Sequence, residues 1–167
     1  QTNIIVTGMT ACFVLYTRSA GVAYFSIGAV FCSLTVKVVK RVVRQPRPPP
    51  EAVLRRKAKQ SYGMPSTHSA TITFFAAYIL LAATYLPVHH SLPLNSASRV
   101  VPVLIIFPWA VMIMMSRVWL GHHTWAQVLA GSAYGVVFAS VWYALWTGGL
   151  DEYGKVVEKE FANRIFI

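Results

Sequence analysis

The segment at 116–127 reads SRVWLGHHTWAQ and is the most informative part of the chain. It is a short polar patch between two apolar runs, which occupy 100–115 and 124–147. A second polar patch, MPSTHS at 64–69, opens another apolar run, and a basic stretch precedes it. Histidine, hydroxyl and cationic side chains bind anions, so these patches predict an anion-binding site within an otherwise apolar chain.

The composition marks the chain as a membrane protein. Of its 167 residues, 56% are hydrophobic, and the mean hydropathy is +0.53, whereas ordinary soluble domains hold about 45–50% apolar residues. The formal net charge is +10, and eight of the fifteen Lys and Arg residues fall within 40–59. This local positive field predicts a local anionic partner. Nucleic acid is excluded, because the basic residues lie between apolar segments without interleaved aromatic side chains, whereas a lipid phosphate fits.

Five apolar runs are candidates for membrane helices, because an α-helix needs about 20 residues to cross the hydrocarbon core of a bilayer. They predict an all-α, polytopic transmembrane helix bundle that forms one domain over residues 1–167. The chain opens with Gln1 rather than Met, so a longer protein with one more helix would have six spans. The mixed-charge tail that follows Gly149 is predicted to be a solvated surface helix. The five runs are 1–17, 19–36, 69–87, 100–115 and 124–147.

The polar patches are predicted to meet on one face of the membrane. The basic stretch at 37–59, where prolines disfavour helix, is expected to be the loop between the second and third spans. The segment at 116–123 is expected to link the fourth and fifth spans, so an even number of crossings separates the two loops. Gly131, Gly135 and Ala139 stand four apart and are predicted to form a face for close helix packing.

Several groups in these patches can bind phosphate. Lys40 and Arg47 combine a compact cation with a planar guanidinium that holds phosphate oxygens in bidentate fashion, and Arg117 adds a further clamp. Taken alone, the first two are more typical of a cytoplasmic basic loop that obeys the positive-inside rule. Ser66 is placed to cap the third helix, whose free backbone N–H groups form an anion site. Ser66 and Thr67 also add hydroxyl donors.

Two histidines and a glutamine are the candidates for catalysis. His68 can act as a general acid or base near neutrality, because an unperturbed imidazole has a pKa of about 6.5. His123 and Gln127 are four apart and share one helix face, where the carboxamide oxygen can orient the imidazole as a nucleophile. His122 competes with His123, but its i+4 neighbour is Ala126, which cannot orient it.

In order and spacing, these residues resemble the signature of the type 2 phosphatidic acid phosphatase superfamily, which is Lys-x6-Arg-Pro, then Pro-Ser-x-His, then Ser-Arg-x5-His-x3-Asp. The chain departs from this signature at Gln127, where the superfamily has Asp. The string HTWAQ at 123–127 is similar to the dolichyl-diphosphatase branch, whose members show His-Thr-x-x-Gln. The three parts are filled here by Lys40 with Arg47-Pro48, by Pro65-Ser66-Thr67-His68, and by Ser116-Arg117 with His123.

The resemblance implies an integral-membrane hydrolase that needs no metal or other cofactor, and the polar patches hold no carboxylate to ligate Mg²⁺. His123 would attack the terminal phosphorus, with Gln127 orienting it, and His68 would protonate the leaving oxygen before water hydrolyses the phosphohistidine. The implied substrate is a polyisoprenyl diphosphate such as dolichyl diphosphate, whose cleavage recycles the lipid carrier for N-glycosylation. The implied phosphate-binding set is Lys40, Arg47, Ser66, Thr67 and Arg117.

Two alternatives stay open. The same site would suit a phosphatase of phosphatidic acid, a sphingoid phosphate or a shorter prenyl diphosphate, or Gln127 would mark a non-catalytic lipid-binding protein. The further cations Arg41, Arg44 and those at 55–59 suit a diphosphate or an anionic membrane surface. The resemblance places the site on the lumenal face of the endoplasmic reticulum, whereas the positive-inside rule places the basic loop in the cytoplasm. We expect the lumenal placement, because several of these cations have a phosphate-binding role.

Overall fold

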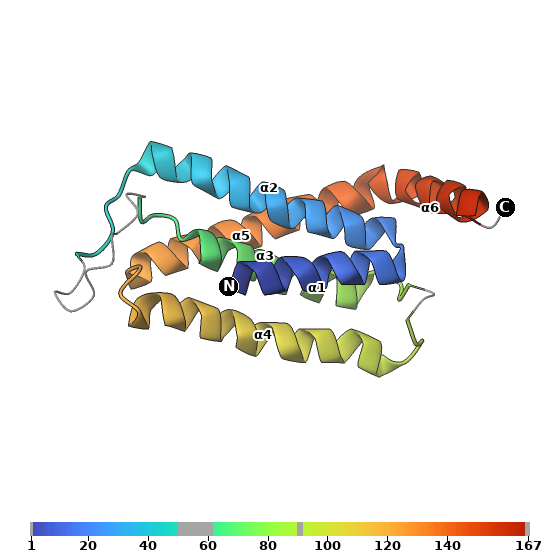
Figure 1. Cartoon of the computed structure of the whole chain (residues 1–167), viewed down its shortest axis with the longest axis horizontal. Coiled ribbons are helices and arrows are strands. Elements are labelled where there is room, and N and C mark those ends of the chain that lie inside the picture. The colour runs from blue at the N-terminus through green and yellow to red at the C-terminus, as the bar shows by residue number, and fades with distance from the viewer. Residues whose placement is uncertain (1, 50–61, 90–91, 166–167) are drawn as a thin grey trace.

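The computed structural model describes residues 2–49, 62–89 and 92–165, and every regular element in that range is helical (Figure 1). The all-α prediction is therefore confirmed. In chain order the elements are α1 (Thr2–Thr17), α2 (Ala20–Val43), α3 (Thr67–Tyr85), α4 (Ser96–Trp119), α5 (Trp125–Leu145), the short π-helix η1 (Trp146–Leu150) and α6 (Asp151–Ile165).

Four helical stretches of the described chain are long and apolar enough to cross a membrane, and they correspond to α2, α3, α4 and the continuous run of α5 with the helices that follow it. The first helix, α1, has 16 residues and is shorter; it packs antiparallel to α2. Apolar side chains such as Leu104 and Val137 are exposed on the outer faces of the bundle, as a lipid environment requires. The predicted polytopic bundle is thus confirmed, with four full spans and a shorter first helix.

The expected loop at 37–59 begins later than predicted. Lys37, Lys40 and Arg41 belong to α2, which continues to Val43 and ends at Arg44 in a left-handed conformation. The reason is that a positive charge does not break a helix, whereas the proline that follows at position 46 does. The prediction of loop structure was therefore wrong for residues 37–43, and the basic end of α2 is a helical platform.

The central helix α3 packs against α5, α4 and α2. Its contact with α5 uses the small residues predicted for close packing: a Cβ added to Gly131 would lie 2.5 Å from the Ser66 carbonyl oxygen, and one added to Gly135 would overlap the Ala70 carbonyl. Ala139 is fully buried in the same interface. Because the two backbones touch here, the start of α3 is held firmly against the start of α5.

Aromatic side chains fix α2 to the same core. Phe74 of α3 is fully buried, and its ring centroid lies 5.7 Å from that of Phe25 on α2. Tyr24 of α2 donates its hydroxyl to the Trp142 carbonyl of α5 at 3.0 Å, and the Trp142 indole donates to the Tyr24 carbonyl at 3.1 Å. The helices α2, α3 and α5 are therefore one packed unit.

The tail forms the predicted helix, α6, which continues the direction of α5 beyond the kink at Gly149. Lys155 is exposed, and it pairs with Asp151 one turn earlier at 2.9 Å. The helix is nevertheless docked at the start of α2, because Glu158 accepts a hydrogen bond from the backbone N–H of Ala20. Only part of its surface is therefore solvated.

One end of the bundle gathers the C-terminal ends of α2 and α4 and the N-terminal ends of α3 and α5 (Figure 1). Ser66 caps α3 by accepting from Ser69 N, as predicted, and Thr124 caps α5 in a capping box with Gln127. These ends carry all three polar patches. The fold thus places the segments that sequence alone selected on the same side of the bundle.

Candidate active site

His123 sits in the turn between α4 and α5 and is only 3% exposed. Its backbone N–H donates to the Arg117 carbonyl at 3.1 Å, and Thr124, the next residue, caps α5. Its ring nitrogen Nδ1 lies 3.1 Å from Oε1 of Gln127, one turn into the helix. The predicted pair of imidazole and carboxamide is therefore formed within one buried unit.

The orientation of the Gln127 carboxamide is fixed by its other partners. Its Nε2 donates to the Pro46 carbonyl at 2.9 Å and to Oε1 of Gln45 at 3.1 Å, and its Oε1 also accepts from the Thr124 backbone N–H at 3.3 Å. A flipped amide would face these groups with the wrong polarity. Since Oε1 can only accept, Nδ1 of His123 carries the hydrogen, and the lone pair lies on Nε2.

Burial lowers the pKa of His123 to about 4; the hydrogen bond that its Nδ1 donates to Gln127 opposes this effect, whereas the positive charges of Arg47 and Lys40 add to it. A backbone hydrogen bond with Gly63 also favours the protonated form. The net result is an imidazole that is neutral near pH 7. A neutral imidazole that Gln127 orients through Nδ1 has the properties of a nucleophile.

His122 differs from its neighbour in every respect that matters for this chemistry. It is exposed, and its side chain makes no hydrogen bond with a described residue. Its backbone N–H also donates to the Arg117 carbonyl, at 3.1 Å, so the two histidines share a turn but not an environment. The geometry therefore distinguishes the two histidines in favour of His123, as the i+4 spacing predicted.

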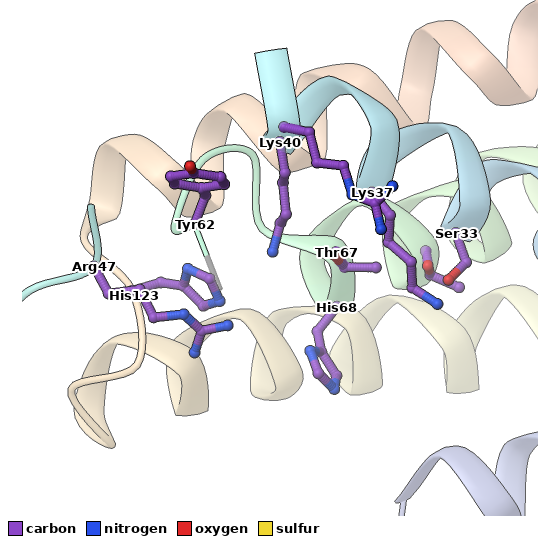
Figure 2. Close-up of a pocket in the computed structure, with 10 residues that line it drawn as sticks. Ser33, Lys37, Lys40, Arg47, Tyr62, Thr67, His68 and His123 are labelled. Carbon is purple, nitrogen blue, oxygen red and sulfur yellow. The ribbon is translucent and has the colours of Figure 1, made fainter. Parts of the chain in front are cut away.

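A cavity of about 500 Å³ opens in front of His123, between α2 and α3 (Figure 2). Lys40 reaches into it from α2 and is only 8% exposed, and Arg47 approaches from the loop that follows α2. Thr67 and His68 enter from the first turn of α3. The structure thus brings together these five predicted residues. The full lining is Ser33, Lys37, Lys40, Arg41, Arg47, Tyr62, Thr67, His68, Thr71 and His123.

Arg117 approaches the same region from α4 through a smaller, adjoining cavity of about 100 Å³. His68 and Thr71 line both cavities, so they form the wall between them. The Nε of Arg117 is buried and has no hydrogen-bond partner among the described residues. A buried guanidinium nitrogen without a partner is costly, and an anion bound beside His68 would satisfy it.

Ser66 occupies a different place from the other predicted phosphate ligands. Its side chain is fully buried, its oxygen accepts from Ser69 N at 3.4 Å, and it does not line either cavity. Its backbone N–H donates to the Gln127 carbonyl at 3.0 Å. Ser66 therefore joins the start of α3 to the start of α5, and Thr67 is the hydroxyl that faces the cavity.

Sequence reasoning did not select two groups that the structure brings to the site. One group comprises Gln45 and Pro46, which are 82 and 81 positions from Gln127 in sequence, together with Gly63; all three lie beside the Gln127 carboxamide. The other group comprises Ser33, Lys37 and Thr71, which line the cavity from α2 and α3 but lie outside the motifs. The sequence could have indicated the first two, because Ser33, Lys37 and Arg41 follow one another at intervals of four and so share one helix face. The predicted contribution of the cations at 55–59 lies outside the described residues.

The charged side chains that line the cavity are positive. The described part of its lining holds lysine and arginine side chains but no carboxylate. All carboxylates of the described chain lie on α6, at the opposite end of the bundle (Figure 1). Within the described residues no three His, Cys, Asp or Glu side chains come together as a metal site. The chemistry of this cavity therefore suits a ligand with several negative charges.

Comparisons with known proteins agree on one family. The family model described as PAP2 superfamily matches residues 6–149. Dolichyldiphosphatase 1 of Dictyostelium discoideum is 33% identical over 135 residues, which cover 79% of this chain and 55% of that protein. Lipid phosphate phosphatase gamma of Arabidopsis thaliana is 33% identical over 151 residues, covering 90% and 64%. The chain thus spans between half and two-thirds of the length of these relatives.

Among solved structures, the chain is similar to a transmembrane PAP2 type phosphatidylglycerolphosphate phosphatase from Bacillus subtilis, with a TM-score of 0.66. The similarity covers 91% of this chain and 70% of that one, at 21% sequence identity. At this level of identity the likeness establishes the fold. It agrees with the helical bundle described above.

Proposed function

The chain belongs to the PAP2 superfamily, and on that premise we propose that it acts as an integral-membrane lipid phosphatase that cleaves a polyisoprenyl diphosphate, such as dolichyl diphosphate, to the monophosphate and inorganic phosphate. The observation that carries this proposal is the buried pair of His123 and Gln127 at the edge of a cationic cavity. An oriented neutral imidazole beside phosphate-binding groups fits phosphoryl transfer better than simple lipid binding.

In the first step, the lone pair on Nε2 of His123 attacks the terminal phosphorus. A P–N bond forms as the P–O bond to the bridging oxygen breaks, and that oxygen leaves with the lipid monophosphate. The negative charge of the bound diphosphate favours the protonated form of His68, which gives its proton to the leaving oxygen from the wall that separates the two cavities. The positive charge that develops on His123 is delocalised over the ring, and Nδ1–H keeps its hydrogen bond to Oε1 of Gln127.

In the second step, water attacks the phosphohistidine. His68, now neutral, accepts a proton from the water, the P–N bond breaks, and inorganic phosphate leaves with His123 restored. Both histidines therefore end the cycle in their starting protonation states. The carboxamide of Gln127 supports both steps without itself exchanging a proton, because an amide does not titrate in this range.

Stabilisation of the transferring phosphoryl group is assigned to the cations around it. Lys40 and Arg47 hold its oxygens from one side of the cavity, and Arg117 approaches from the other. Thr67 adds a hydroxyl at the start of α3, where free backbone N–H groups and the helix dipole favour negative charge. With no carboxylate in the described lining, these groups take the place that divalent metals hold in other phosphoryl-transfer enzymes, and we propose that the reaction is metal-independent.

The choice of a dolichyl-type diphosphate is supported by two observations. Curated relatives named Dolichyldiphosphatase 1 match this chain at 32–36% identity over its larger part. The His-Thr-x-x-Gln pattern at 123–127 also agrees with that branch. On this basis we place the protein in the endoplasmic reticulum, with the site facing the lumen and the reaction recycling the lipid carrier of N-glycosylation.

A second candidate keeps the same site but changes the lipid. Lipid phosphate phosphatase gamma of Arabidopsis thaliana covers more of this chain than the first of those relatives, at the same 33% identity. This observation favours a phosphatase of phosphatidic acid, a sphingoid phosphate or a shorter prenyl diphosphate. A non-catalytic lipid-binding role would leave the aligned His123 and Gln127 pair without a purpose.

The experiment that tests the proposal measures phosphate release by the purified protein in detergent micelles, with EDTA present throughout. The substrates are a long-chain polyprenyl diphosphate, phosphatidic acid and a sphingoid phosphate, and His123→Ala is the control. We expect release mainly from the diphosphate, unaffected by EDTA and absent in the variant. Release mainly from the monophosphate lipids would move the assignment to the second candidate. A folded protein that releases phosphate from none would be non-catalytic.

A further inference from the structure

The cavity extends well beyond the residues that the first phosphate needs. Past Lys40, the same face of α2 presents Lys37 and then Ser33, and Thr71 faces them from α3. Figure 2 shows Lys37 and Ser33 on the side of Lys40 that lies away from His123. The proposed catalytic cycle gives none of the three a role. We therefore asked what this inner part of the cavity can bind.

The spacing of the side chains that line the inner part of the cavity follows from helix geometry. Lys37 lies three residues before Lys40 on α2, which corresponds to about 4.5 Å along the axis at about 1.5 Å per residue. Ser33 lies one further turn from the nucleophile. In Figure 2 the His68 ring lies between His123 and Lys37. A proton donor in that position suits an oxygen that bridges an outer and an inner group.

The hydroxyl groups of the inner part are free. Serine and threonine side chains in helices commonly donate to a backbone carbonyl one turn earlier. Here Thr35 does so, donating to the Phe31 carbonyl at 2.8 Å, and Ser26 donates to Val22 at 2.8 Å. Ser33 and Thr71, in contrast, make no hydrogen bond within the described part of the chain, although both line the cavity. Their hydroxyls are available to a ligand.

Lys37 is similarly unpaired, although the residue is exposed and only lines the cavity with part of its side chain. It makes no hydrogen bond or ion pair with any residue in the described ranges, and the carboxylates of those ranges lie at the far end of the bundle. Its ammonium group and two hydroxyls are a donor set without an internal acceptor. Such a set matches a second phosphate, which offers several acceptor oxygens and negative charge.

We propose that Lys37, Ser33 and Thr71 form a subsite for the phosphate that stays on the lipid, and that this subsite makes the site selective for diphosphates over monophosphates. The assignment rests on the proposed function, because it takes His123 as the nucleophile for the outer phosphate. The lipid chain then continues from the inner phosphate toward the membrane interior. A monophosphate fills only the outer subsite, beside Lys40 and Arg47.

The kinetic test compares a polyprenyl diphosphate with the polyprenyl monophosphate of the same chain length. We expect Lys37→Met to lower kcat/KM for the diphosphate about tenfold or more, because a charge-assisted contact is lost, and to change the monophosphate rate much less. Lys37→Arg should keep most of the selectivity. Lys159→Met, which removes an exposed lysine of α6 outside the cavity, is the matched control. An equal loss on both substrates, or no loss on either, would overturn the subsite.

A binding test separates this inference from catalysis. Methylenediphosphonate and methylphosphonate cannot be cleaved at the bond in question, and each should raise the melting temperature of the His123→Ala protein. Adding Lys37→Met should remove the advantage of methylenediphosphonate and leave stabilisation by methylphosphonate. If the wild-type protein hydrolyses no lipid yet shows this Lys37-dependent advantage, the proposed function fails and the subsite stands. If the two ligands bind alike with Lys37 present, the subsite is wrong whatever the enzyme cleaves.

Discussion

Nδ1 of His123 lies 3.1 Å from Oε1 of Gln127, in a site where the superfamily signature has Asp. The same carboxamide donates from Nε2 to the Pro46 carbonyl at 2.9 Å, and Pro46 is the residue immediately before Arg47. One side chain therefore holds both His123, the proposed nucleophile, and the loop that carries Arg47. An aspartate could orient the imidazole, but it has no N–H group for the loop. Compared with aspartate, glutamine lacks the negative charge beside the imidazole but gains a hydrogen bond to the loop.

Replacing His123 by Ala should abolish turnover, whereas replacing His122 by Ala should leave most of it. The reason is that only His123 is buried, oriented and placed at the cavity. Loss of an attacking group costs about 10³-fold or more in kcat. Steady-state phosphate release by the two purified variants checks this. Similar losses in both would mean that the nucleophile has been assigned to the wrong residue.

Replacing Gln127 by Ala should lower kcat by about 10–100-fold while the protein still folds, because the nucleophile and the loop lose their common support. Gln45→Ala removes only one of the two acceptors of Nε2 and should cost less. The measurement is kcat for both variants, with melting temperature as the check on folding. A Gln127→Ala protein with unchanged kcat would remove this residue from the mechanism.

The protonation of His123 should depend on its neighbour in a predictable direction. Burial holds its pKa near 4, so the reactive neutral form persists as the pH falls well below the ordinary value of about 6.5. Gln127→Glu places a negative charge beside the ring and should raise that pKa. As the pH falls, the ring of this variant should therefore become protonated at a higher pH than the ring of the wild-type protein. NMR titration of protein labelled with ¹⁵N-histidine follows this directly, and His123→Ala assigns the signal. A His123 signal that titrates near 6.5 in the wild-type protein would contradict the structure.

A methyl group at position 63 should disturb the site without touching the substrate. A Cβ at Gly63 would overlap the Gln127 carboxamide, whereas a Cβ at Gly148 meets no atom within 4 Å. Gly63→Ala should therefore lower kcat in the manner of Gln127→Ala, and Gly148→Ala should not. Combining Gly63→Ala with Gln127→Ala tests the path of the effect. Losses that simply multiply in the double variant would show that Gly63 acts independently of Gln127.

Much of the fold could be predicted from sequence, because apolar runs of helical length report spans directly. The ends of those runs were less predictable. The helix α2 continues through Lys37, Lys40 and Arg41, since charge alone does not end a helix. The length and hydropathy of an apolar run predict a membrane span, whereas the ends of a helix depend on caps and on proline.

The candidate site likewise has features that the sequence could predict and features that it could not. His123 and Gln127 could be paired from their spacing, because four residues of helix place them on one face. The contacts of Gln127 with Pro46 and Gly63 could not, because they join segments far apart in the chain through the packing of α3 on α5. Ser66 was correctly predicted as a cap, yet the tight approach of Gly131 to its backbone buries its side chain away from the cavity.

The most direct test of the central claim is to trap the covalent intermediate. The wild-type protein is mixed with polyprenyl diphosphate labelled on its terminal phosphate and quenched in alkali, where phosphohistidine survives, and the labelled peptide is identified by mass spectrometry. We predict that the label appears on His123, is absent from His123→Ala and accumulates when His68→Ala slows the second step. Turnover without any label on His123, or a label on another residue, would contradict the account.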